Sequence, residues 1–535
     1  MDTQKIRLFL IFAMMALGML LADKWHQSSE AAKVVTSEVS ALPGKAGEMS
    51  AVPTVGMVPG AEPLKGMVNV ETDVFAIKID PNGADFIKTE LKQFPISGDN
   101  AQPFSLLNRD PNRYYIVQGG LISDMGPDSR ERGRAVWVSE KTDYRLTPAS
   151  ESLVVPFIWR NGQGLTVEKR IEFIRGNYVA TVSYFIKNNM STPWHGRMYG
   201  QIKRDEKSSS GLLSSTSAYT GAAYHQEDEP YTKLSFSDMR KKPLDMKEKG
   251  GWVAMMEHYF VSAWIPDPDA THELYSRVDD KLYSVGFINP EIEVLPGQEK
   301  TVSASLYMGP EVPKVLGELS PGLELTVDYG IFWPIAQPIF WLLKSIHQYV
   351  GNWGAAIILV TLLIKLLFFQ LSATSYRSMA KMRKIQPEMQ RLKERYGEDR
   401  QQMSQKVIEL YKREKVNPLG GCLPILVQIP VFISLYYVLL ESVELRQAPF
   451  IGWIQDLSAK DPYFVLPICM GLSMLVQQRL SPAPADPTQA KVMMMMPIVF
   501  TVLFMNFPAG LVLYWVVNNV LSISQQWVIT KRIGA

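Results

Sequence analysis

The chain has 535 residues, of which 47% are hydrophobic and 20% are charged, and its 55 basic residues nearly balance 53 acidic ones. This composition excludes wholesale disorder, a collagen-like repeat and a strongly basic nucleic-acid binder, so we expect no direct recognition of nucleic acid. The two cysteines, Cys422 and Cys469, lie in apolar stretches without zinc-binding spacing. No phosphate loop or hydrolase motif occurs, and the sequence predicts neither a metal nor another cofactor.

The N-terminus combines a basic flank with a short apolar segment. Lys5 and Arg7 precede Leu8–Ala22, which contains no charged residue. This pattern is typical of a membrane anchor or a cleaved signal peptide, and the lack of a small-x-small cleavage pattern favours an anchor over residues 1–25. Residues 26–67 are rich in Ala, Ser, Val, Pro and Gly and predict a flexible tether.

Residues 68–322 have the pattern of a large exported antiparallel β-sandwich. Apolar and polar residues alternate in short runs such as Val74–Ile79, Thr166–Phe173 and Tyr178–Ile186. Asn161 and the glycine after it lie between two such runs and predict a hairpin turn. The many short alternating runs favour two packed sheets over a helical domain.

The hydrophobic residues gather in the last third of the chain. Residues 323–352 predict an amphipathic helix, which either lies in the plane of the membrane interface or packs on the sandwich. After it, five apolar segments predict membrane spans, making six with the N-terminal anchor. The expected spans are residues 353–372, 421–441, 463–478, 492–507 and 510–528, with a cytoplasmic hairpin at 373–420, a periplasmic segment at 442–462, a cytoplasmic loop at 479–491 and a short cytoplasmic tail at 529–535.

The basic residues of the loops predict the orientation. The segment Ser372–Leu419 holds twelve Lys or Arg residues against six Asp or Glu, and basic residues also flank the first and last spans. Because loops rich in Lys and Arg stay in the cytoplasm, six spans put both termini inside. The expected fold is therefore a multi-span α-helical membrane protein, N-in and C-in, with a large exported antiparallel β-sandwich.

Lys365 is the most informative single residue, because it lies in an apolar span about 18 Å from either end at helical rise. A charge at that depth costs about 3 kcal/mol, so it needs a wet cavity or a partner, unless its stem snorkels to the interface. Thr361 lies one turn earlier on the same face, and other spans supply further polar groups: Gln428, Asn506, Asn518, Asn519 and Ser522. We interpret them as a hydrated, positively charged groove whose counter-charge arrives with the substrate.

The loop at 373–420 predicts an antiparallel helical hairpin with a basic outer surface. Pro387 is expected to begin its first helix, where Met389 and Leu392 recur at helical spacing. Such a hairpin could meet lipid headgroups, a nascent chain or a ribosome; a solvated basic loop is the simpler alternative. The residues expected to make these contacts are Arg391, Lys393, Arg395, Lys412 and Arg413.

Several longer motifs resemble the YidC/Oxa/Alb family of membrane protein insertases. The motifs in the membrane part are Tyr411–Cys422, Pro424–Pro430, Ser442–Pro449 and Phe507–Tyr514, and Gly250–Met255 and Ala263–Pro266 are similar to the periplasmic domain of Gram-negative members. The resemblance covers essentially the whole chain apart from the tether.

This resemblance implies an insertase and chaperone of the bacterial inner membrane, without ATP or enzymatic chemistry. Its clients would be nascent membrane proteins, and it would act among membrane lipids, alone or with the Sec translocon. The family has a hydrophilic groove with a cationic residue, usually arginine, where this chain has Lys365. Thr361 and Gln428 match groove-lining positions, and Tyr514 matches a family tyrosine whose neighbour, a tyrosine in some relatives, is Trp515 here.

Two functions of other classes compete with insertion. A solute transporter or channel would use the intramembrane Lys365 as a solute site and would need a second buried charge or an inverted repeat. An exported sugar-binding or sugar-modifying domain would need clustered carboxylates on adjacent strand ends. Neither feature is apparent in the sequence.

Overall fold

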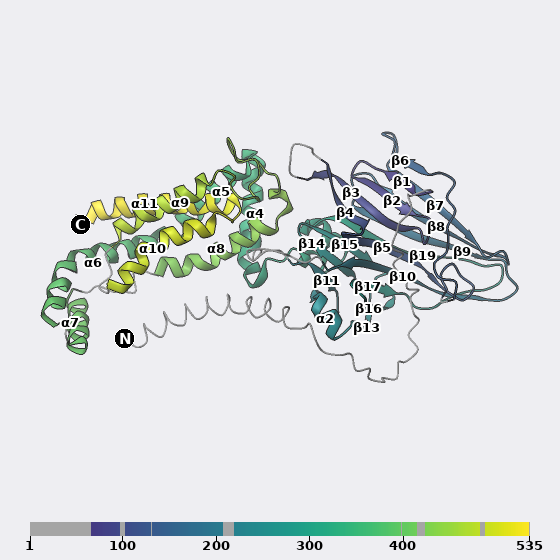
Figure 1. Ribbon diagram of the computed structural model, residues 1–535, viewed down its shortest axis with the longest axis horizontal. Helices are drawn as coiled ribbons and strands as arrows, with labels where there is room; N and C mark the ends of the chain where they lie inside the picture. Colours follow the sequence, from purple (N-terminus) through teal and green to yellow (C-terminus); the bar gives the residue numbers. More distant parts are fainter. Residues whose placement is uncertain are drawn as a thin grey trace.

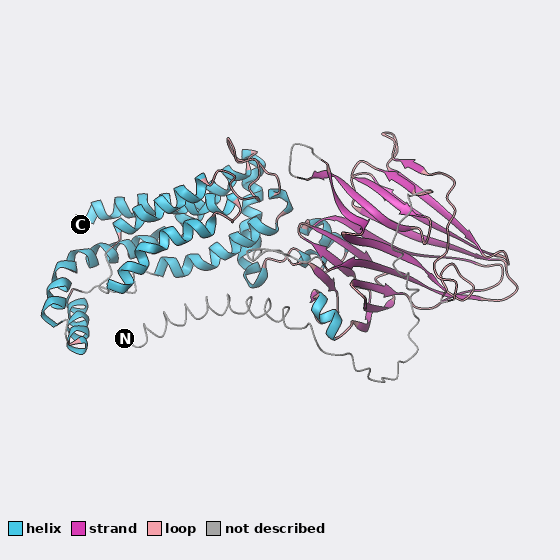
Figure 2. Ribbon diagram, in the orientation of Figure 1, coloured by secondary structure: helices cyan, strands magenta, loops and turns pink. Residues whose placement is uncertain are grey.

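The computed structural model describes residues 66–96, 102–129, 131–206, 219–396, 399–414, 423–481 and 487–533. The anchor predicted at 1–25 lies outside these residues, as does nearly all of the tether predicted at 26–67. A β-domain and a helical domain lie end to end along the long axis of the molecule (Figure 1). Strands and helices are almost completely separated between the two domains (Figure 2).

The β-domain consists of two sheets that pack face to face. The larger, 11-stranded sheet has the order β13-β16-β17-β10-β5-β4-β3-β2-β1-β6, with β18 beside β10. Its strands are β1 (Val68–Glu71), β2 (Phe75–Asp80), β3 (Asp85–Pro95), β4 (Pro103–Asp110), β5 (Arg113–Ile122), β6 (Asp143–Arg145), β10 (Trp194–Asp205), β13 (Asp245–Lys249), β16 (Thr271–Asp279), β17 (Leu282–Ile288) and β18 (Ile292–Val294).

The second, 8-stranded sheet has the order β12-β11-β14-β15-β19-β9-β8-β7. Its strands are β7 (Ser152–Arg160), β8 (Leu165–Ile174), β9 (Val179–Asn188), β11 (Gly221–Tyr224), β12 (Thr232–Leu234), β14 (Val253–Glu257), β15 (Phe260–Ile265) and β19 (Glu299–Pro310). Pairing is antiparallel in both sheets except between β1 and β6, which are parallel. The predicted β-sandwich is therefore confirmed, with this one parallel pair as an exception.

The alternation of apolar residues explains why these segments become strands. In β8, every second residue is buried between the sheets: Leu165, Val167, Lys169, Ile171 and Phe173 alternate with partly or fully exposed residues. The predicted turn before β8 is present: the Asn161 side-chain oxygen accepts from the backbone N–H groups of Gln163 at 2.8 Å and of Leu165 at 2.9 Å.

The helices follow the β-domain in the chain, apart from the short α2 (Phe236–Lys241) within it. They are α3 (Pro313–Leu319), α4 (Trp333–Val350), α5 (Trp353–Leu367), α6 (Phe369–Tyr396), α7 (Arg400–Arg413), α8 (Leu423–Glu441), α9 (Val465–Leu480), α10 (Pro487–Phe504) and α11 (Ala509–Ile533). Among the described residues, no single helix is both long and apolar enough for a membrane crossing. Helices α5 and α6, which are bent by 68° relative to each other, are together long and apolar enough for one crossing, judged by length and composition alone.

Helix α4 lies within residues 323–352, where the sequence predicted an amphipathic helix. It buries Ala336, Ile339 and Leu343 in a core shared with α5 and α8, and it leaves Trp333 and Trp341 exposed. Its main packing partners are thus other helices. Packing on the sandwich was one of the two predicted alternatives, and the sandwich is not the main partner.

The helical hairpin differs from the expectation at one residue. Pro387 lies inside α6, so the prediction that it begins a helix is wrong. Proline removes one helical hydrogen bond, and the carbonyl left without it belongs to Arg383. Because Arg383 is exposed, the loss of this bond costs little free energy. Helices α6 and α7 pack through Ile385, Met389 and Leu410, and these contacts hold the hairpin together.

The segment that follows α8 makes non-covalent contacts with the β-domain. Arg446 and Gln447 both donate to the carbonyl of Pro95, at 2.7 and 2.6 Å. The Arg446 guanidinium also lies 5.7 Å from the Phe104 ring centre and 5.8 Å from that of Phe260. These contacts fix the β-domain against one end of the helical domain.

Candidate functional site

A cavity of about 400 Å³, lined by polar and apolar side chains, lies among α6, α8, α9, α10 and α11. Its wall comes mainly from the parts of these helices that lie away from the β-domain (Figure 1). Amide, hydroxyl and thioether groups dominate the wall, and none of its residues is acidic or basic. The lining residues are Ser375, Tyr376, Met379, Gln428, Ile429, Phe432, Met474, Gln477, Gln478, Ser481, Met493, Met496, Pro497, Tyr514, Trp515, Asn518, Asn519, Ser522 and Gln526.

Lys365 lies directly behind this wall. Its side chain is buried, and its Nζ donates to the hydroxyl of Ser522 at 2.7 Å. The Ser522 hydroxyl in turn donates to the carbonyl of Asn518 at 2.7 Å. No carboxylate in the described part of the chain interacts with Lys365. The cation is therefore one hydroxyl away from the cavity and is not neutralised there.

The predicted groove residues Gln428, Tyr514, Trp515 and Asn518 lie on the cavity wall. Thr361 does not. It is buried, and its hydroxyl donates to the carbonyl of Ile357 at 2.6 Å, one turn back in its own helix. A helical threonine often donates its hydroxyl proton in this way, and Thr361 is not among the residues that line the cavity.

Three aromatic residues of the cavity wall, Phe432, Tyr514 and Trp515, belong to a larger aromatic cluster. Trp515 makes edge contacts with Phe432 at 4.6 Å and with Phe504 at 5.1 Å between ring centres. Phe504 stacks on Phe507 at 4.8 Å, and Tyr514 stacks on Phe432 at 6.2 Å. Such a cluster buries large apolar surface, so this part of the cavity wall is apolar.

The polar face of α11 contributes more of the wall than its predicted residues alone. Asn518, Ser522 and Gln526 recur every four residues and so lie on one side of the helix. Asn519 donates to the Ser473 hydroxyl at 2.9 Å, which links α11 to α9. Asn518, Asn519 and Ser522 had been predicted as polar groups of the groove, and Gln526, which continues the spacing of four, is the residue that the prediction missed.

The predicted contact residues of the hairpin are mostly solvated. Arg391, Arg395 and Lys412 are exposed, while the side chain of Lys393 lies outside the described residues. Arg413 bonds to Glu388 of α6 at 2.5 Å. This residue therefore helps to hold the two helices together, and the other three are free of such an inter-helix ion pair in the described structure.

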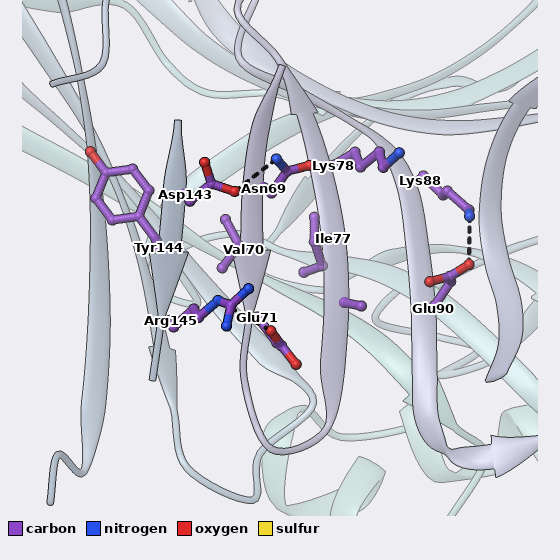
Figure 3. Close-up of a pocket in the computed structure, with 11 residues that line it drawn as sticks. Asn69, Val70, Glu71, Ile77, Lys78, Lys88, Glu90, Asp143, Tyr144 and Arg145 are labelled. Carbon is purple, nitrogen blue, oxygen red and sulfur yellow. Dashed lines mark hydrogen bonds and ion pairs between the residues drawn. The ribbon is translucent and has the colours of Figure 1, made fainter. Parts of the chain in front are cut away.

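A small hollow of about 140 Å³ lies on the outer face of the β-domain, over β1, β2, β3 and β6 (Figure 3). Its charged groups pair with one another: Lys88 with Glu90 at 2.5 Å and Arg145 with Glu71 at 3.5 Å. Asn69 also donates to Asp143 at 3.0 Å. Carboxylates neutralised in this way do not favour the alternative of a sugar-modifying domain.

Comparison with known proteins identifies the class of protein. Residues 67–342 match the family described as YidC periplasmic domain, and residues 345–535 match the family described as 60Kd inner membrane protein. The membrane protein insertase YidC of Stutzerimonas stutzeri is 48% identical over 550 residues, covering 99% of this chain and 98% of the relative. The YidC of Pseudomonas putida is 49% identical with the same coverage.

A crystal structure of an active YidC insertase with its first transmembrane domain resolved is also similar, with 17% sequence identity and a TM-score of 0.38. The alignment with this structure covers 89% of the present chain and 94% of the chain in the YidC crystal structure. On the family matches and the full-length relatives, the chain belongs to the YidC family of membrane protein insertases. It is an inner-membrane protein with a periplasmic domain, and this family is one of insertases and not of enzymes.

Proposed function

We propose that this insertase admits the hydrophilic flank of a nascent membrane protein into the cavity among α6 and α8–α11, where the charge of Lys365 attracts the client's carboxylates. The observation that carries the proposal is a buried lysine one hydroxyl away from a polar cavity, with no carboxylate partner in the described structure. An uncompensated buried charge is costly, and an acidic client flank would supply the missing counter-charge.

The proposal includes the six-span, N-in and C-in arrangement. In that arrangement the polar part of the cavity faces the cytoplasm and the aromatic cluster around Trp515 faces outward. Helix α4 then lies at the outer surface of the membrane, with Trp333 and Trp341 in the headgroup region, which suits their amphipathic rings.

The energy for insertion comes from the client itself in this mechanism. Burial of its apolar helix in lipid contributes about 25 cal/mol per Å² of apolar surface. The membrane potential acts on the charges of the translocated flank and adds to the drive. The cavity lowers the cost of the crossing because its amides and hydroxyls replace water around the flank.

The α6–α7 hairpin is the proposed contact for partners on the cytoplasmic side. Arg391, Arg395 and Lys412 are exposed on it, and such cations suit ribosomal RNA phosphates or anionic lipid headgroups. We further propose that the insertase works either alone or beside the Sec translocon, depending on the client.

Site-specific photocrosslinking to a stalled nascent membrane protein tests the proposal. A crosslinker placed at Gln428 or Tyr514, on the cavity wall, is expected to capture the client. The same probe at Thr361, which is bonded to its own helix, is expected to react much less. The exposed Leu367, 77% accessible and away from the cavity, is the control for nonspecific contact. Equal capture from all four positions would contradict a client path through the cavity.

A further inference from the structure

The hydroxyl of Ser522 stands between the buried lysine and the cavity. Ser522 belongs to the cavity wall, whereas Lys365 does not, and the two side chains meet across α5 and α11 at 2.7 Å. Both are buried: Lys365 is 6% exposed and Ser522 is 3% exposed. A client group that enters the cavity therefore reaches the serine before it reaches the ammonium group.

The bonding of this serine has a fixed direction. An ammonium group can only donate, so the Ser522 oxygen must accept from Lys365. The single proton of the hydroxyl is then directed to the carbonyl of Asn518, at 2.7 Å. Ser522 is thus oriented by its own helix with its lone pairs toward the lysine, and it is the hydrogen-bond partner that the structure gives to Lys365.

From this geometry we propose that Ser522 is a positioning residue for the insertion reaction: it holds the Lys365 ammonium charged and aimed at the cavity until a client carboxylate takes its place as acceptor. The inference rests on the proposed function, because it assumes that Lys365 attracts client carboxylates. In this inference, Ser522 contributes to the preference for clients with acidic flanks, whereas insertion as such does not depend on it.

The test compares two single-span clients, one with an acidic and one with a neutral translocated flank, in vesicles that contain the full-length insertase. Ser522→Ala is expected to lower the ratio of acidic-flank to neutral-flank insertion by about tenfold, since it removes a hydrogen bond to a charged group. Ser522→Thr keeps the hydroxyl and is expected to restore most of the ratio.

Ser524→Ala is the matched control. Ser524 lies on the same helix and makes the same kind of bond, to the carbonyl of Val520 at 2.9 Å, but its side chain is exposed and does not contact Lys365. The Ser524→Ala variant is expected to show the same ratio of acidic-flank to neutral-flank insertion as the unaltered protein. If Ser522→Ala lowers insertion of both clients equally, the serine has only a structural role and the inference is overturned.

Lys365→Gln, measured with the same clients, separates this inference from the proposed function. If Lys365→Gln leaves the ratio unchanged, the charge-attraction mechanism itself fails. If Lys365→Gln lowers the ratio and Ser522→Ala does not, only the role of Ser522 is refuted. The double variant is expected to be no worse than Lys365→Gln alone, because the serine acts through the lysine.

Discussion

The two domains bury positive charge in opposite ways. In the β-domain, Arg134 and Lys169 lie in the core beside Asp85 and Asp128, so two cations meet two carboxylates. Arg134 forms ion pairs with both aspartates, and Lys169 donates to three backbone carbonyls at 2.8 to 3.1 Å. In the helical domain, Lys365 has the hydroxyl of Ser522 and no carboxylate in the described structure.

The difference bears on which of the buried charges could still bind a ligand. A group in the core whose cations are paired with carboxylates and backbone carbonyls favours one packing of the strands and is already occupied by its own partners. A cation held by a single neutral acceptor beside a polar cavity remains able to bind an anion. Burial alone therefore does not identify a functional charge; the number of its built-in partners does.

Reversing the helical charge is expected to have the largest effect. Lys365→Glu should abolish the insertion of single-span clients with acidic flanks, because like charges then meet in the cavity. Lys365→Arg, which keeps the charge, should preserve insertion. Reconstituted vesicles give the measurement, and normal insertion by the Glu variant would refute the role assigned to this residue.

Breaking the balanced group should instead cost stability. Arg134→Met leaves Asp85 and Asp128 buried without their shared cation, and we expect the free energy of unfolding of the β-domain to fall by about 3–5 kcal/mol. Urea unfolding of the full-length protein, followed by the fluorescence of its buried tryptophans, measures this loss. Arg170→Met is the control, since Arg170 pairs with Glu168 at the surface and should cost at most about 1 kcal/mol. Equal losses for the two variants would show that the buried group is not special.

The β-domain should also respond to pH through Lys169. Burial lowers the pKa of Lys169 to about 7 from its ordinary value of 10.5. Between these values the unfolded chain binds more protons than the folded one, so stability should rise with pH, by up to about 1.4 kcal/mol per pH unit. Unfolding at pH 7, 8 and 9 should show this slope in the unaltered protein and lose it in Lys169→Met. The same slope in both proteins would mean that Lys169 does not titrate in this range.

The smallest effect is expected at the junction of the domains. Arg446→Lys keeps the charge but loses the planar group that faces Phe104 and Phe260, and the cost should be about 1 kcal/mol. Thermal unfolding in detergent should show a decrease of a few degrees. An unchanged transition would indicate that the contacts of the guanidinium with the two rings contribute little to holding the domains together.

Local patterns were enough to predict much of the architecture. Alternation marked β8 and β9, the Asn161 turn followed from its own side chain, and the basic loop contained the expected pair of helices. Pro387 misled the prediction because a proline signals a helix start only where the chain has not already formed a helix before it. Thr361 and Lys365 share a helix face and both lie off the cavity wall, but only Lys365 bonds to a residue of that wall, Ser522, whereas Thr361 bonds to its own helix.

The sequence by itself determined that a sandwich, an amphipathic helix and apolar segments follow one another, and that one lysine lies deep among apolar residues. These features depend on neighbours within a few residues, where periodicity and turn chemistry act directly. Only the tertiary structure decided which charges are neutralised. Asp85 and Arg134 are 49 residues apart in the chain, and Lys365 and Ser522 are 157 apart. Partners so distant meet through the packing of whole strands and helices, and this packing surrounds Arg134 with carboxylates but gives Lys365 a neutral hydroxyl as its partner.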